Sequence, residues 1–205
     1  MGNFVSVMVD EPALDRIVGS RDRSQLPAVR AACSGLETER AKKLALAERL
    51  IDGEFTAEEQ PDAPLFVYLF QDVCRAVARH KTTEEIYVDE DQFPEMWEFV
   101  WDAGETRFGL PLSPHGSPAV GYWDGPGVKR FIATFAGLDQ ADLEERAGKA
   151  YTEEMARLLE VLEAAEREAR GVFVFLASSG DGLRPECRAM AMAPAPRRRI
   201  GRPGA

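Results

Sequence analysis

Residues 172–177 form an unbroken apolar run, Val-Phe-Val-Phe-Leu-Ala, directly after Gly171. Successive side chains of a strand point to opposite faces of its sheet. A strand with no polar position is therefore typical of a sheet that is buried on both faces. This run requires the rest of the chain to cover it from two sides.

A second strand is predicted over residues 3–9, which are rich in Val and Phe and stop at Asp10-Glu11-Pro12. Pro12 fits the first turn of a following helix. Between these two strands, apolar residues recur mostly at helical spacing. The clearest case predicts a helix over about residues 64–80, with a broad apolar stripe. The pattern also predicts a short strand at 85–88 and helices at about 24–33, 39–51, 91–101 and 125–136. Two further helices are predicted, a short one that begins at residue 139 and a long one from residue 152 to Gly171.

Two strands near the ends of the pattern, with helices between them, predict a single three-layer α/β domain in which a small sheet is covered by helices. We assign residues 1–179 to this domain. Beyond Ser179 the sequence consists mainly of Gly, Pro, Ala and Arg and includes Arg197-Arg198-Arg199. Such a composition buries too little apolar surface to order itself, so residues 180–205 are predicted to be a flexible basic tail.

The charge balance and the start of the sequence narrow the function classes. A net charge of −10 repels a phosphate backbone, so nucleic acid is disfavoured and a basic protein partner is more compatible. No stretch approaches the roughly 20 consecutive apolar residues of a membrane span. The first ten residues also lack a secretory signal, and we expect a cytoplasmic protein without membrane contact. The three cysteines are widely spaced, and we interpret all three as thiols.

One candidate ligand site lies in residues 104–125, a stretch with five glycines and three prolines that is predicted to be the longest loop. His115 can exchange protons near neutral pH, and Tyr122 and Trp123 can stack on a planar ligand. The plainer interpretation is that the two aromatic residues cover the core and that His115 is simply exposed. We favour the plainer interpretation, because a pocket needs converging polar groups that a sequence does not display.

A second candidate surface is acidic. Residues 139–168 contain ten acidic residues and four basic ones, mostly on the polar sides of two predicted helices. Glu144, Glu145, Glu160 and Glu163 are the candidate contacts for a basic partner protein. The alternative, which the pattern favours, is that these charges only keep the protein soluble.

Metal and cofactor chemistry find little support in the sequence. Asp89-Glu90-Asp91 lacks the alternating ligands and the distal glutamate of a calcium loop, and an acidic turn that caps a helix explains it better. His80 is expected to end the 64–80 helix, where an imidazolium meets the negative end of the helix dipole. With two histidines and no paired cysteines, we predict no metal and no cofactor. No catalytic residue is identified, and whether the chain is an enzyme stays open.

Three segments carry a resemblance to a known family: residues 46–54, residues 121–138, and the closing helix and strand over residues 155–176. In order and character they resemble the YfbM-like proteins and a related actinobacterial family of unknown function. The resemblance covers about residues 3–177 and implies a three-layer α/β domain of bacterial, cytoplasmic origin. It carries no catalytic residue. Because some relatives of this kind are encoded near toxin genes, it also implies an immunity or inhibitor role.

Two function hypotheses follow from the sequence. The first is a non-enzymatic protein-binding module, of which the immunity or inhibitor type is one form, that uses its acidic helices or the 113–125 loop. The second is a small-molecule enzyme or sensor with a pocket at His115, Tyr122 and Trp123. Nucleic-acid binding through the arginines of the tail is a third, weaker interpretation. The oligomeric state is not predicted.

Overall fold

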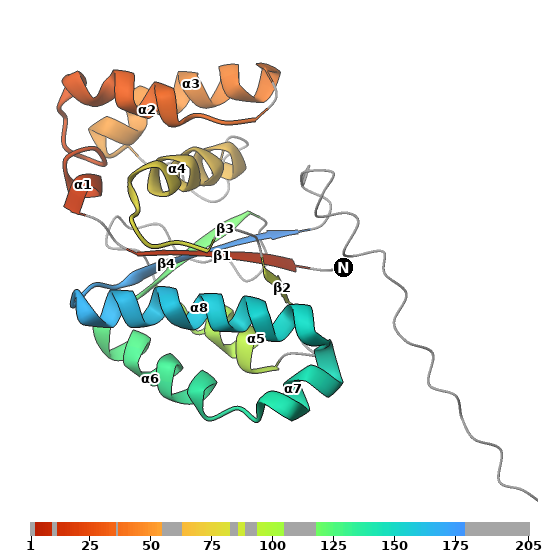
Figure 1. Ribbon diagram of the computed structural model, residues 1–205. Coiled ribbons are helices and arrows are strands. Elements are labelled where there is room, and N and C mark those ends of the chain that lie inside the picture. The colour runs from red at the N-terminus through yellow and green to blue at the C-terminus, as the bar shows by residue number, and fades with distance from the viewer. Residues whose placement is uncertain are drawn as a thin grey trace, which may run out of the picture.

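A four-stranded sheet forms the centre of the computed structural model, which describes residues 3–9, 12–35, 37–54, 63–82, 86–88, 94–104 and 118–178. The strand order is β2-β1-β4-β3, and every neighbouring pair is antiparallel. Helices lie on both sides of the sheet (Figure 1), which confirms the predicted α/β domain with a small sheet covered by helices. The strands are β1 (Asn3–Val9), β2 (Ile86–Val88), β3 (Ala119–Trp123) and β4 (Val172–Ser178).

The helices divide between the two faces of the sheet in chain order: α1 to α4 cover one face, and α5 to α8 cover the other. In Figure 1, α4 lies next to the sheet on one face, with α2 and α3 on the outer side of α4. On the other face α8 lies next to the sheet, and α6 and α7 lie farther out. The first group consists of α1 (Pro12–Asp15), the 3-10 turn η1 (Arg23–Gln25), α2 (Leu26–Ala32), α3 (Glu37–Asp52) and α4 (Ala63–Val77). The second consists of α5 (Pro94–Trp101), α6 (Gly125–Ala136), α7 (Gln140–Ala147) and α8 (Lys149–Arg167).

Strand β4 lies at the centre and is buried on both faces, as its unbroken apolar sequence predicts. Val172, Val174 and Leu176 belong to the hydrophobic cluster on the α5–α8 side. Phe173 and Phe175 belong to the cluster on the α1–α4 side. None of these five side chains is more than 4% exposed. The alternation follows from the two-residue period of a strand, and it lets one strand hold two separate cores together.

Aromatic packing joins each helix layer to the sheet. The ring of Phe70 on α4 meets Phe173 edge-on, with ring centroids 5.4 Å apart. On the opposite face, the ring centroid of Phe131 on α6 lies 4.6 Å from that of Trp123 on β3. Edge-to-face geometry is the favoured arrangement for such rings, and full burial of each side chain is worth about 1.5–3 kcal/mol relative to exposure.

Most predicted elements differ from the structure by a few residues at their ends, and two of these differences affect residues that the sequence singled out. The helix predicted for residues 64–80 ends at Val77, so the prediction that His80 ends a helix is wrong. His80 instead places Nε2 3.1 Å from Oε1 of Glu168, beyond the end of α8. The predicted loop 104–125 contains β3, whose pairing with β4 provides the hydrogen bonds that its local sequence did not reveal. Asp124 caps α6 as expected, since its side chain accepts a hydrogen bond from the backbone N–H of Gly127.

Gly171, between α8 and β4, lies so close to β3 that no side chain fits there. A Cβ atom at this position would overlap the phenol of Tyr122 and the backbone oxygen of Trp123. We therefore expect Gly171→Ala to lower the free energy of unfolding by about 1–3 kcal/mol, the usual cost of overpacking. Urea unfolding followed by circular dichroism measures the change.

Gly125 is the matched control for this substitution. A Cβ atom there would meet nothing within 4 Å, and the residue begins α6. Gly125→Ala should change the free energy of unfolding by no more than about 0.5 kcal/mol. Equal unfolding midpoints for the two variants would contradict the packing that we describe at Gly171.

Candidate functional site

Tyr122 and Trp123 are neighbours on β3, and they face opposite sides of the sheet. Trp123 belongs to the α5–α8 cluster, where its Nε1 donates a hydrogen bond of 2.9 Å to the backbone oxygen of Phe99. Tyr122 packs against the other cluster, with its ring centroid 5.1 Å from that of Phe173. The structure therefore does not bring these two side chains together in one pocket.

His115, the third predicted ligand residue, lies outside the described residues. The ligand-binding role of His115, Tyr122 and Trp123 stays a prediction. The plainer interpretation of the two aromatic residues agrees with their packing, because both rings contact core side chains. Adjacent residues of a strand diverge by the geometry of the strand itself, which a loop prediction did not take into account.

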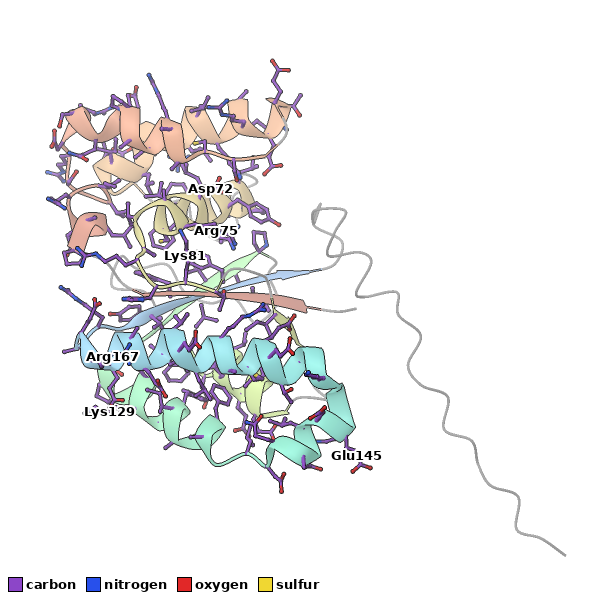
Figure 2. All side chains as sticks on the ribbon, in the orientation of Figure 1. Asp72, Arg75, Lys81, Lys129, Glu145 and Arg167 are labelled. Atoms are coloured by element: carbon purple, nitrogen blue, oxygen red, sulfur yellow. The ribbon has the colours of Figure 1, made fainter. Side chains whose placement is uncertain are left out.

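The acidic face consists of the four predicted partner-binding residues, Glu144 and Glu145 on α7 and Glu160 and Glu163 on α8. All four are exposed. Glu145 lies two residues from the buried Leu143, and Glu160 lies two residues from the buried Leu158, which places each carboxylate on the outer side of its helix. Figure 2 shows the side chain of Glu145 pointing away from the body of the molecule.

Three cations near the acidic face are already paired with carboxylates, one of which is Glu163 of the face itself. Arg146 lies 3.0 Å from Asp142 and 3.6 Å from Glu95 of α5. Arg167 lies 3.9 Å from Glu163, one turn earlier on the same helix. Lys149 forms a comparable pair with Glu153 at 3.8 Å.

Three carboxylates of the acidic face are left without a counter-charge. Within the part of the chain that the structure describes, the side chains of Glu144, Glu145 and Glu160 form no ion pair or hydrogen bond. Glu163 differs from them through its contact with Arg167. The arrangement offers exposed negative charge to a cationic surface, and it offers no geometry for acid-base or nucleophilic chemistry.

A buried charged network on the opposite side of the molecule was not predicted from the sequence. Lys43 of α3 is 3% exposed, and its Nζ lies 2.9 Å from Asp72 of α4 and 3.1 Å from Glu39. Nζ also donates a hydrogen bond of 3.2 Å to the backbone oxygen of Ser34. Asp72 in turn accepts hydrogen bonds from the backbone N–H and the hydroxyl of Ser34, at 3.0 and 2.5 Å. Figure 2 shows Asp72 on α4 beneath the α2–α3 layer.

The Lys43 network ties helices together rather than forming a reactive centre. The ammonium has three acceptors and the carboxylate has three donors, so both groups are satisfied inside the protein. A buried pair of this kind fixes how α3 sits on α4 more than it adds stability. In the sequence, only the four-residue spacing of Glu39 and Lys43 indicated an ion pair, and nothing linked Lys43 to Asp72.

The two described cysteines, Cys33 and Cys74, are free thiols and both are buried. Burial raises the pKa of Cys33, and the negative charge of Asp72 raises it further. A raised pKa keeps the thiol protonated at neutral pH, and the thiolate is the form that reacts. Both cysteines are core residues, and the raised pKa favours the less reactive thiol form of Cys33.

Neither a metal site nor a membrane span is found in the described residues. No group of three or more His, Cys, Asp or Glu side chains there is placed to hold a metal ion. No described helix is both long and apolar enough to cross a membrane. Asp89-Glu90-Asp91 lies outside the described residues.

Comparison with known protein families identifies the family of this chain. A family model described as a domain of unknown function, DUF7691, matches residues 1–177, so the chain belongs to that family. No curated protein and no solved structure matches the chain. The family assignment differs from the predicted resemblance to YfbM-like proteins, for which the comparisons give no support.

The Lys43 network leads to a prediction about stability. Asp72→Ala leaves Lys43 with only the half-exposed Glu39 as a counter-charge, and it removes both acceptors of Ser34. We expect the free energy of unfolding to fall by about 3 kcal/mol, and the double substitution Lys43→Met with Asp72→Leu to restore most of it. Urea unfolding of the three variants measures both effects.

The exposed contact of Arg23 with Glu48 and Asp52 provides the control for this prediction. Because water screens this contact, Arg23→Ala should leave the unfolding midpoint near that of the natural chain. A loss for Arg23→Ala as large as that for Asp72→Ala would show that burial is not the cause of the effect.

Thiol alkylation tests the burial of the two described cysteines. With iodoacetamide at pH 8, we expect Cys33 and Cys74 to stay unmodified in the folded protein, because the reagent needs access and a thiolate. Both should react once urea unfolds the chain. Peptide mass spectrometry measures the modification of each cysteine separately. If Cys33 in the folded protein reacted as fast as it does in the unfolded chain, its burial would be contradicted.

Proposed function

We propose that this member of the DUF7691 family is a non-enzymatic protein-binding module whose acidic face docks a basic segment of a partner protein. Immunity or inhibitor action is the finer form of the proposal, and it rests on the resemblance to YfbM-like proteins alone. The cytoplasm is the location in which we expect this binding to occur.

One observation carries the proposal: Glu144, Glu145 and Glu160 are exposed and have no counter-charge among the described residues. Carboxylates that only keep a protein soluble are commonly interspersed with cations of the opposite sign. Here the neighbouring cations Arg146 and Arg167 are held by Asp142 and Glu163. The negative potential of the acidic face therefore remains available to a cationic partner.

Electrostatic complementarity mainly accelerates and orients association. The net charge of −10 attracts a basic partner over a distance of about one Debye length, which is roughly 8 Å at physiological salt. Each exposed ion pair contributes at most about 1 kcal/mol, so several such pairs are needed for a stable contact. Apolar contacts around the charged pairs would have to supply the remaining affinity.

Charge reversal tests the proposal, with capture from the native host as the first step. We expect the natural chain to capture a basic protein, and Glu145→Lys with Glu160→Lys to slow its association at least tenfold. Biolayer interferometry with the purified partner measures the association rate at two salt concentrations. Steered association should slow as salt rises, whereas the dissociation rate should change much less.

A matched control separates the acidic face from net charge. Glu37 on α3 and Glu98 on α5 are exposed and unpaired among the described residues, and reversing both changes the net charge by the same amount. Glu37→Lys with Glu98→Lys should keep nearly natural association. If both pairs of reversals slow binding equally, only net charge matters and the docking face is refuted. Loss of the partner's own activity in the complex would support the immunity or inhibitor form.

A further inference from the structure

The chain contains a basic segment that complements its own acidic face. Residues 179–205 include six arginines and two acidic residues, and four of the arginines are Arg197, Arg198, Arg199 and Arg202. We propose that residues 194–205 dock on the acidic face of α7 and α8 and compete there with a basic partner. This regulation rests on the proposed function, because it concerns the same surface.

Strand β4 ends at the end of the molecule that the proposal requires. Strand β4 begins at Val172, shortly after α8 ends at Arg167, and it runs back along the sheet. Figure 1 shows that β4 points toward the end of the molecule where α7 joins α8. The C-terminal end of β4 therefore lies at the end of the molecule that carries α7 and Glu145, and not at the end of α8 that carries Arg167.

The intervening sequence is long enough for the contact. Arg197 follows Ser178 by about 19 residues, and a flexible chain of that length has a root-mean-square span of roughly 24 Å. Its fully extended limit is about 60 Å. The 19 residues of α8 extend over about 28 Å, so the arginines can reach either helix of the acidic face.

The acidic face is a better match for the basic segment than the outer layer of the other side. Helix α3 carries four acidic and four basic residues, so its charges cancel. Helices α7 and α8 together carry eight acidic residues and four basic ones. Arginine suits this surface because its guanidinium forms two parallel hydrogen bonds to one carboxylate.

Tethering makes a weak contact sufficient. Each exposed pair is worth at most about 1 kcal/mol, but a tether of about 19 residues raises the effective concentration of the arginines at the acidic face to the order of millimolar. The docked state is then populated within one molecule at low salt and lost at high salt, because exposed charges are screened. A basic partner has to displace the segment, which raises the concentration of partner needed for binding.

Paramagnetic relaxation in the full-length protein tests the docking without any partner. Cys187 lies ten residues before Arg197 in the sequence. Because Cys33 and Cys74 are buried, we expect a nitroxide reagent applied to the folded protein to label Cys187 in preference to them. We expect the label to broaden the amide signals of Glu144, Glu145 and Glu160 at least twofold more than those of α3. The broadening should disappear in 0.5 M salt.

The matched variant keeps the chain length and removes only the charge. Arg197→Gln, Arg198→Gln and Arg199→Gln together should abolish the selective broadening on α7 and α8. Broadening that is equal on α3 and α8, or that persists in this variant, would overturn the proposal. Broadening that increases with protein concentration would also overturn it, because the segment would then dock on a second copy.

Failure of this inference is distinguishable from failure of the proposed function. If the tail does not dock, the charge-reversal measurements with a partner still stand on their own. If the tail docks, the glutamine variant should bind a captured partner several-fold more tightly than the natural chain does, at low salt. Unchanged partner affinity in that variant would refute the competition while leaving partner binding intact.

Discussion

Two hydrophobic cores depend on one strand. Val172, Val174 and Leu176 of β4 face the α5–α8 layer, while Phe173 and Phe175 face the α1–α4 layer. Antiparallel sheets commonly leave one face to water, but this one is covered on both faces. Because β4 pairs with both β1 and β3, displacement of β4 would break most of the sheet and both cores together.

The two sides of the molecule differ in how their charged groups are paired. On the α1–α4 side, the buried Lys43 finds Asp72, Glu39 and Ser34, and every group is satisfied internally. On the α7–α8 side, Glu145 and Glu160 stand exposed with no partner in the described part of the chain. A buried charge is costly unless groups inside the protein pair with it, whereas water solvates an exposed charge, which therefore remains available to a partner molecule. For this reason we assign a structural role to the first group and a binding role to the second.

Much of the fold follows from local sequence, and the candidate sites follow from it less well. The apolar stripe that includes Phe66 and Phe70 predicted α4 to within a few residues, and Asp124 marked the start of α6. The exposure of Glu144, Glu145, Glu160 and Glu163 also agrees with their places on the polar sides of amphipathic helices. Strand β3 was missed, because a short segment among glycines and prolines is defined by its pairing partner rather than by its own pattern.

The sequence by itself determined that β4 is buried on both faces, that helices cover it, and that acidic residues gather on the last two helices. These properties depend on side-chain period and composition, which are local. Only the tertiary structure decided that Tyr122 and Trp123 pack on opposite faces of the sheet. The same is true of the ion pair between Lys43 on α3 and Asp72 on α4. The tertiary structure also decided which carboxylates Arg146 and Arg167 neutralise. Contacts between residues far apart in the sequence depend on how the helix layers pack on the sheet. Local sequence patterns do not predict that packing.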